Sequence, residues 1–129
     1  MKPELINGGV HGDARGMLRF CNDFNMSAVK RFYTIANSVD QPVRGWIGHR
    51  RETKWFFPIK GTTVIFVETM DGINTKTPTR FVLSATNPAV LKIPGGNLFC
   101  IEQHDDAEVM VFSDCKVGEY ENDDYRRAL

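Results

Sequence analysis

Hydrophobic and polar residues alternate along much of the chain, a pattern typical of β-strands that bury one face. In residues 29–36, for example, Arg31, Tyr33 and Ile35 fall on one face. A helix capped at Ser27 is the rival interpretation of this stretch, but its β-branched and aromatic residues favour a strand. Together the patterns predict strands over residues 4–6, 17–22, 29–36, 53–60, 62–70, 80–84, 89–93, 98–103 and 108–113.

Turn-forming residues separate these strands at intervals of roughly 8–12 residues, a rhythm that predicts an all-β sandwich or barrel. Residues 53–60 and 62–70 are expected to form a hairpin that turns at Lys60-Gly61. The second arm is apolar on both faces, so it is expected to be a central strand. A loop begins at Met70-Asp71-Gly72, and the last segment, 118–129, is interpreted as a short helix or tail.

Composition narrows the possible partners and compartment. The chain of 129 residues is expected to form one domain over 1–129, and its 16 basic and 16 acidic residues give no formal net charge. Neither nucleic acid nor a membrane is therefore an expected partner. No apolar run reaches a membrane-spanning length of about 18 residues, and the start lacks the apolar core of a signal peptide. Cys21, Cys100 and Cys115 are interpreted as reduced thiols of a cytoplasmic protein.

Candidate chemistry is concentrated between Arg44 and Gly61, which hold both tryptophans and a group of cations. In an extended chain, Gly45, Ile47 and His49 would share one face, and Arg44 would share the other with Trp46. If the run lines a barrel, its imidazole, guanidinium, ammonium and indole groups suit an anionic organic ligand that contains a flat ring. The other cations, Arg50 and Arg51, are expected to face solvent.

A family resemblance is carried by short motifs that run through nearly the whole chain. They are Asp13-Ala14-Arg15-Gly16-Met17-Leu18, Val29-Lys30-Arg31-Phe32-Tyr33, Arg44-Gly45-Trp46-Ile47-Gly48-His49, Lys54-Trp55-Phe56 with Gly61, Ala89-Val90-Leu91-Lys92-Ile93-Pro94-Gly95-Gly96 and Ala107-Glu108-Val109-Met110-Val111. In order and spacing, the chain resembles the cupin nucleotide-sugar enzymes: the dTDP-4-dehydrorhamnose 3,5-epimerases and the dTDP-hexose 3,4-ketoisomerases, including WxcM-like domains.

The resemblance implies an antiparallel jelly-roll barrel, usually a homodimer that exchanges N-terminal strands, with a nucleotide-linked 4-keto sugar at the barrel mouth. It implies that Arg15 and Arg31 help bind the diphosphate and that Arg44 borders the pocket. The chemistry would be proton transfer next to a keto group, in polysaccharide sugar biosynthesis, with His49 moving the proton and Lys54 stabilising the enolate. Tyr33 shares a face with Arg31: the two are either site residues, which makes Tyr33 a catalytic candidate, or a structural pair.

Further candidates and departures concern the two cupin motifs. Asn97 stands where the family usually has a histidine after the proline-glycine turn, and it is a candidate substrate-binding residue together with Glu102. Glu102 and His104 form either an acid–base pair or a surface turn. The position of the family's usual catalytic histidine is Ile47. The alternative function is therefore a non-catalytic cupin that binds a nucleotide sugar or a partner enzyme. With so few ligands, no catalytic metal or cofactor is expected.

Overall fold

The computed structural model describes residues 1–71 and 77–129, and within them it contains β-strands and no helix. The loop expected to begin at Met70 therefore lies partly outside the described residues. The prediction of an all-β chain is confirmed. The strands are β1 Glu4–Asn7, β2 Gly9–Asp13, β3 Gly16–Phe20, β4 Arg31–Ile35, β5 Val43–His49, β6 Lys54–Lys60, β7 Thr62–Thr69, β8 Thr79–Ser84, β9 Ala89–Ile93, β10 Asn97–Gln103, β11 Glu108–Ser113 and β12 Tyr125–Arg126.

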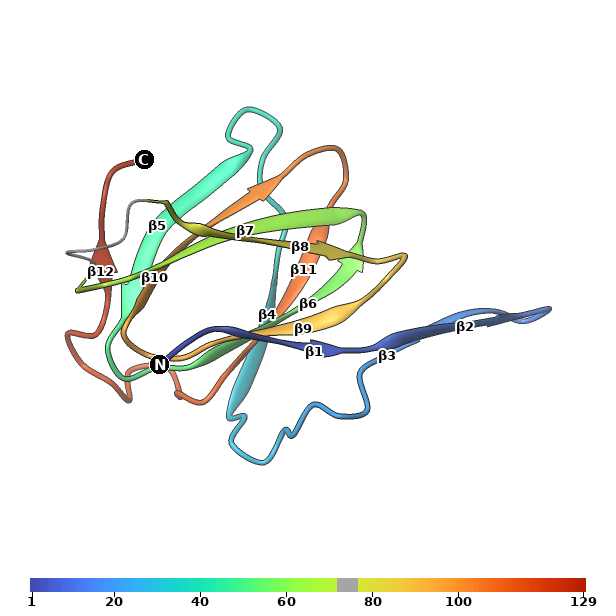
Figure 1. The fold of residues 1–129 in the computed structure, drawn as a ribbon, viewed down its shortest axis with the longest axis horizontal. Helices are drawn as coiled ribbons and strands as arrows, with labels where there is room; N and C mark the ends of the chain where they lie inside the picture. Colours follow the sequence, from blue (N-terminus) through green and yellow to red (C-terminus); the bar gives the residue numbers. More distant parts are fainter. Residues whose placement is uncertain (72–76) are drawn as a thin grey trace.

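Two five-stranded antiparallel sheets form the body of the protein (Figure 1). One has the order β1-β9-β6-β11-β4 and the other the order β12-β5-β10-β7-β8. Their facing sides bury one apolar cluster that includes Phe56, Ile65, Leu91 and Val109. This arrangement is the jelly-roll barrel expected from the sequence, and β7 is an inner strand as predicted.

The predicted hairpin at Lys60-Gly61 is wrong. β6 pairs with β9 and β11 in one sheet, whereas β7 pairs with β10 and β8 in the other. Gly61 lies at the corner between the sheets with a φ of 65°, and a Cβ there would lie 3.1 Å from the Cα of Ala107. A glycine can make this sharp change of direction where other residues are strained. The local pattern of two strands around a turn did not distinguish a sheet-changing corner from a hairpin.

A bulge in β5 decides which of its residues face the barrel interior. Ile47 lies opposite Phe99 and Arg44 opposite Ile101, so three steps of β5 match two steps of β10. Arg44 and Ile47 consequently face the same side, which corrects the alternation expected from the sequence. At the bulge the two strands approach closely, because a Cβ on Gly45 would lie 2.2 Å from that of Cys100. Only glycine fits there.

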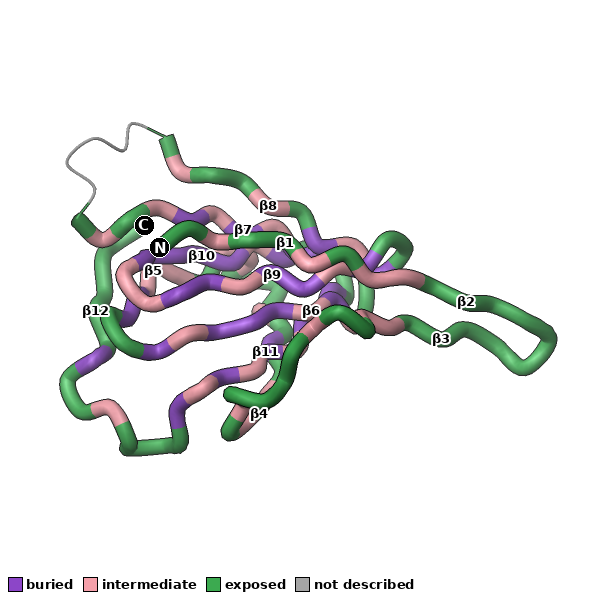
Figure 2. The backbone as a smooth tube through the Cα atoms, turned by 60° about the horizontal axis from the view of Figure 1, so that its bottom comes forward, coloured by how far each residue is buried: buried purple, intermediate pink, exposed green. Residues whose placement is uncertain are grey.

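The hairpin of β2 and β3 extends away from the barrel and is exposed along most of its length (Figures 1 and 2). Asp13 stabilises its turn by accepting a hydrogen bond from the backbone N–H of Arg15 at 2.8 Å. Before the hairpin, β1 pairs along its length with β9 of the same chain. The hairpin exposes apolar side chains, among them Met17 at 61% and Leu18 at 57%.

The C-terminal tail is not the short helix considered as one possibility from the sequence. Tyr125 and Arg126 form β12, which pairs with Gly48 and Ile47 at the edge of β5. Two backbone hydrogen bonds between Trp46 and Arg127 extend this pairing, because each residue donates to the carbonyl of the other. The tail thereby satisfies an otherwise open sheet edge. The part of the chain that the structure describes holds no helix that could cross a membrane.

Candidate active site

A cavity of about 380 Å³ lies between the two sheets, beside β4, β5 and the C-terminal tail. Five of the residues singled out from the sequence line it, and they come from three strands: Arg31 and Tyr33 from β4, Arg44 and His49 from β5, and Lys54 from β6. Phe56, Phe99 and Ile101 supply apolar wall. The cavity thus combines an apolar wall with a larger set of polar and charged side chains, a lining that suits a charged ligand.

The ring of His49 is held in one tautomer. Its Nδ1 lies 2.8 Å from the backbone carbonyl oxygen of Asp123, and a carbonyl oxygen can only accept a hydrogen bond. Nδ1 therefore carries the proton in the neutral ring, and Nε2 keeps its lone pair. Nε2 is buried and has no hydrogen-bond partner among the described residues. A cavity-lining imidazole that keeps an unpaired nitrogen is a candidate general base.

Glu52 is the centre of the polar network in this cavity, and it lines the cavity although it is only 6% exposed. Its Oε2 accepts hydrogen bonds from Ser113 Oγ at 2.5 Å and from Arg31 Nη2 at 3.3 Å. The same oxygen lies 3.9 Å from Lys54 Nζ, while Oε1 lies 3.7 Å from His49 Nδ1. One buried carboxylate therefore contacts two buried or half-buried cations beside the imidazole and offsets one of their two charges.

The ammonium group of Lys54 lies inside the barrel, as the sequence predicted, and the residue is 7% exposed. Its Nζ is 5.6 Å from the centre of the Tyr33 ring and 5.8 Å from that of Phe99. The guanidinium of Arg31 is also 5.1 Å from the Tyr33 ring. In these partly apolar surroundings, a positive charge interacts more strongly with a developing negative charge than it would in water.

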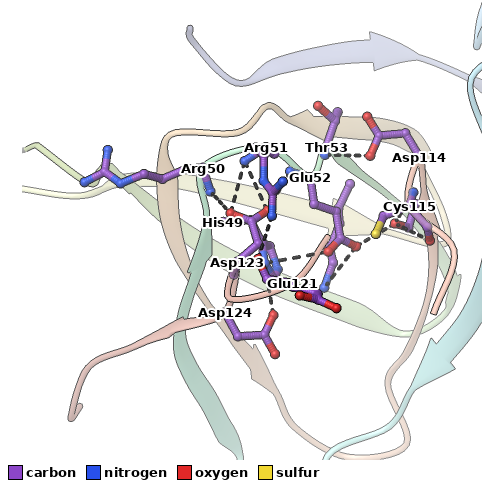
Figure 3. Close-up of polar contacts among 12 residues, drawn as sticks. His49, Arg50, Arg51, Glu52, Thr53, Asp114, Cys115, Glu121, Asp123 and Asp124 are labelled. Atoms are coloured by element: carbon purple, nitrogen blue, oxygen red, sulfur yellow. Dashed lines mark hydrogen bonds and ion pairs between the residues drawn. The ribbon is translucent and has the colours of Figure 1, made fainter. Parts of the chain in front are cut away.

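Asp123 connects the tail to the loop after β5 (Figure 3). Its carboxylate accepts hydrogen bonds from the backbone N–H groups of Arg50 at 2.8 Å, Glu52 at 3.0 Å and Arg51 at 3.1 Å. Burial opposes ionisation of this carboxyl group, yet the three N–H donors outweigh it and hold the pKa of Asp123 below its usual range. These three hydrogen bonds, called here the Asp123 clamp, fix the loop that carries Glu52 and the backbone carbonyl that orients His49.

Replacing Asp123 by asparagine is expected to lower the free energy of unfolding by about 2 kcal/mol at pH 7, because an amide N–H₂ then faces backbone N–H groups. The carboxylate's contribution is present above the unfolded-state pKa of about 3.9 and is lost as the pH falls through the lower folded-state value. The difference between wild type and variant should therefore shrink as the pH falls below about 4. Urea unfolding at several pH values measures it, with Asp40→Asn at an exposed position as the control. A difference that does not change with pH contradicts this role.

Three residues predicted to bind substrate lie away from this cavity. Arg15 is at the exposed tip of the β2–β3 hairpin, where its guanidinium contacts Asp13. Asn97 is buried near the N-terminus and donates to the carbonyls of Met1 and Pro94. Glu102 is 2.7 Å from His104 Nε2, and that imidazole is largely exposed, so the pair lies at the surface. Within its own chain, the structure brings none of the three to the site.

The tail and the loop contribute cavity residues that were not identified from the sequence: Glu52, Asp124 and Arg126. Asp124 Oδ1 lies 3.3 Å from His49 Nδ1. Glu52 had a local signal, because it stands three residues after His49 and two before Lys54. Asp124 and Arg126 had none, since they reach the site through contacts between residues more than 70 positions apart.

The charges that line the cavity leave a positive surplus. Arg31, Arg44, Lys54 and Arg126 are cationic, and Glu52 and Asp124 are anionic, so a neutral His49 leaves two uncompensated positive charges. The diphosphate of a nucleotide sugar, esterified at both ends, carries two negative charges. Among residues 1–71 and 77–129, no three His, Cys, Asp or Glu side chains are placed to hold a metal ion. The expectation of a metal-free reaction remains a prediction.

The solved structures that this fold resembles include 3,4-ketoisomerases and an epimerase. A 3,4-ketoisomerase from Helicobacter canadensis has a TM-score of 0.75 and 21% identity, over 98% of this chain and 92% of that one. The rmlC epimerase of Mycobacterium tuberculosis has a TM-score of 0.75 and 14% identity, over 96% and 68%. A histidine-to-asparagine variant of a 3,4-ketoisomerase from Thermoanaerobacterium thermosaccharolyticum, in complex with TDP-4-keto-6-deoxyglucose, has a TM-score of 0.74 and 17% identity, over 97% and 87%.

These likenesses establish the fold of the chain as the jelly-roll barrel of these 3,4-ketoisomerases and this epimerase. No protein-family model matches the sequence, and no curated protein matches it. The activity is therefore argued from the cavity's own residues.

Proposed function

We propose that the protein is an isomerase that transfers a proton next to the keto group of a nucleotide-linked 4-keto-6-deoxyhexose. The observation that carries the proposal is the pairing of an unpartnered imidazole nitrogen on His49 with the buried ammonium of Lys54 in one cavity. The positive surplus of the cavity suits a diphosphate. The TDP-sugar bound to a protein of the same fold supports this substrate class.

The residues divide the chemistry between them. Nε2 of His49 removes the proton on the carbon next to the carbonyl, and the electron pair of that C–H bond moves to the carbonyl oxygen to give an enediolate. Lys54 stabilises the oxygen anion, while Glu52 and Asp124 stabilise the imidazolium through Nδ1. His49 then returns the proton to the former carbonyl carbon, while the neighbouring hydroxyl passes its proton to the former carbonyl oxygen and becomes the new ketone. Atoms and charge balance without any redox partner.

Within this class, we favour ketoisomerisation over epimerisation. Among the described residues, His49 is the one imidazole that lines the cavity. A single base that removes and returns a proton on the same face moves the keto group between adjacent carbons. Inversion at one carbon requires a proton donor on the opposite face, a role for which Tyr33 is the candidate on the cavity wall. The products of the two reactions differ in structure, so they can be distinguished directly.

The test is to incubate the pure protein with dTDP-4-keto-6-deoxyglucose and follow the sugar by NMR. We expect the 13C signal of the ketone to move from position 4 to position 3 of the ring. If instead the configuration at position 3 or 5 is inverted and the ketone stays at position 4, the activity is epimerisation and not ketoisomerisation. If this sugar and its close relatives bind but stay unchanged, the result favours the alternative that the protein binds a nucleotide sugar without catalysis.

We propose further that the protein is a homodimer whose β2–β3 hairpins are exchanged. Val10, Met17 and Leu18 on the hairpin are between 37% and 61% exposed, and an apolar arm of this kind needs a partner. Because β1 stays on its own sheet, the hairpin is the part that would reach the other subunit, and it would carry Arg15 toward that subunit's cavity. The free thiols fit a reducing compartment, so we place the protein in the cytoplasm, in the synthesis of polysaccharide sugars.

Introducing glutamates at Met17 and Leu18 together is expected to convert the dimer to a monomer, because both hairpin faces then become charged. Sedimentation velocity measures the change. The control is Val39→Glu, at a position that is 90% exposed and outside the hairpin. A wild-type protein that sediments as a monomer at the same concentration contradicts the dimer.

A further inference from the structure

We propose that the C-terminal tail supplies a substrate-binding residue, Arg126, which acts with Arg44 to hold the diphosphate group of the ligand. This inference rests on the proposed function, and it assigns the diphosphate site to the tail and β5. Both residues line the cavity, and both are exposed to solvent. Because a guanidinium offers several donors in one plane, two of them can bind both phosphates of one diphosphate.

Strand register explains why Arg126 faces inward. It lies directly opposite Ile47 in the β12–β5 pair, and directly opposed residues of an antiparallel pair share a face. Ile47 lines the cavity, and so does Arg126. The β5 bulge places Arg44 on the same face as Ile47. β5 and β12, which are far apart in the sequence, therefore place Arg44 and Arg126 on the same side of the sheet.

The residues that flank Arg126 hold the tail in place. The ring of Tyr125 lies 5.6 Å from the guanidinium of Arg50. The guanidinium of Arg127 is 4.6 Å from the ring of Trp46 and forms an ion pair with Glu68. With the backbone bonds between Trp46 and Arg127, these contacts anchor both neighbours of Arg126. The inward side chain is thus placed by its neighbours without being used in the anchoring itself.

Arg44 and Arg126 are also the cavity cations that remain available to an anion. Arg31 and Lys54 both lie within 4 Å of the Glu52 carboxylate. In the described part of the chain, by contrast, no carboxylate is within ion-pair distance of Arg44 or Arg126. Arg15, the other arginine expected at the diphosphate, is paired with Asp13 outside the cavity of its own chain. The two uncommitted arginines account for the positive surplus of the cavity.

The experiment measures binding of dTDP, thymidine and inorganic pyrophosphate to the wild type and to Arg126→Ala, Arg126→Lys and Arg80→Ala by calorimetry. Arg80 is the control because it is exposed on β8, at the opposite edge of the same sheet. We expect Arg126→Ala to weaken binding of dTDP and of pyrophosphate by roughly tenfold or more and to leave thymidine binding unchanged. Arg126→Lys should recover part of the loss, and Arg80→Ala should bind like the wild type.

Equal dTDP affinity in the wild type and Arg126→Ala overturns the proposal. So does a variant that keeps its affinity for dTDP and loses kcat, since Arg126 would then act at the reacting carbons; a rise in KM at unchanged kcat supports the proposal. The proposed function fails separately. If the wild type binds pyrophosphate through Arg126 but never alters a keto sugar, the anion-site proposal stands and the isomerase proposal fails. If the wild type turns over the sugar and the Arg126 substitutions do not change binding, the isomerase proposal stands and the Arg126 proposal fails.

Discussion

Replacing His49 by asparagine is expected to lower the rate of proton exchange at the sugar ring by about a thousandfold or more. General acid–base catalysis by a positioned side chain contributes 10² to 10⁴-fold, and an amide cannot take up the proton. Asparagine still carries an N–H donor for the Asp123 carbonyl, so the loop geometry should be retained. Deuterium exchange into the ring, followed by NMR, measures the rate, and circular dichroism with dTDP binding verifies the fold and the site.

The chain provides matched controls for this substitution in its other two histidines, His11 and His104. Both imidazoles are largely exposed, and neither lines the cavity. His11→Asn and His104→Asn should exchange at the wild-type rate. A His49→Asn protein within about threefold of the wild type would mean that another group is the base, and Glu52 or Tyr33 would then be the next residues to replace.

Replacing Lys54 by methionine is expected to reduce exchange by about 10² to 10³-fold, the usual cost of removing one group that stabilises a developing oxyanion. Methionine fills a similar volume among Tyr33 and Phe99 without the charge. Because Lys54 is assigned to the enolate and not to the diphosphate, the affinity for dTDP should stay close to that of the wild type. Steady-state turnover and calorimetry with dTDP give the two quantities.

Lys60→Met is the matched control, since Lys60 ends the same strand with a side chain that is 61% exposed and close to Asp106. It should leave both turnover and affinity unchanged. A Lys54→Met protein that loses dTDP affinity while its kcat is unchanged would place the ammonium at the diphosphate, and the division of roles between Lys54 and Arg126 would be wrong.

Most of the barrel follows from local sequence patterns. Alternation and turn residues located nine of the twelve described strands and missed β2, β5 and β12. The barrel strands among the nine could be found because each buries one face against the same core. The corner at Gly61 and the bulge at Gly45 were not predictable, since both depend on how separate strands approach each other. The bulge matters most for function, because it turns Arg44 toward the cavity and beside Ile47.

The site was predictable on β4, β5 and β6 and not in the tail. His49 and Lys54 were found because their residue types and spacing match a known motif, and the structure places both on the cavity wall. The clamp formed by Asp123, by contrast, joins its carboxylate to backbone N–H groups, which carry no residue signature. β12 consists of two residues, too few for a periodic pattern. Its pairing is decided by the open edge of β5.

The most direct measurement is solvent exchange by the wild-type protein. The protein is incubated in heavy water with dTDP-4-keto-6-deoxyglucose, and the ring positions next to the ketone are followed by NMR and mass spectrometry. A working His49–Lys54 site predicts that deuterium enters the ring, that the signal depends on enzyme concentration, and that it disappears in His49→Asn. Tight binding of the sugar with no deuterium in the ring and no movement of the ketone, for this substrate and its close relatives, would contradict a catalytic cavity.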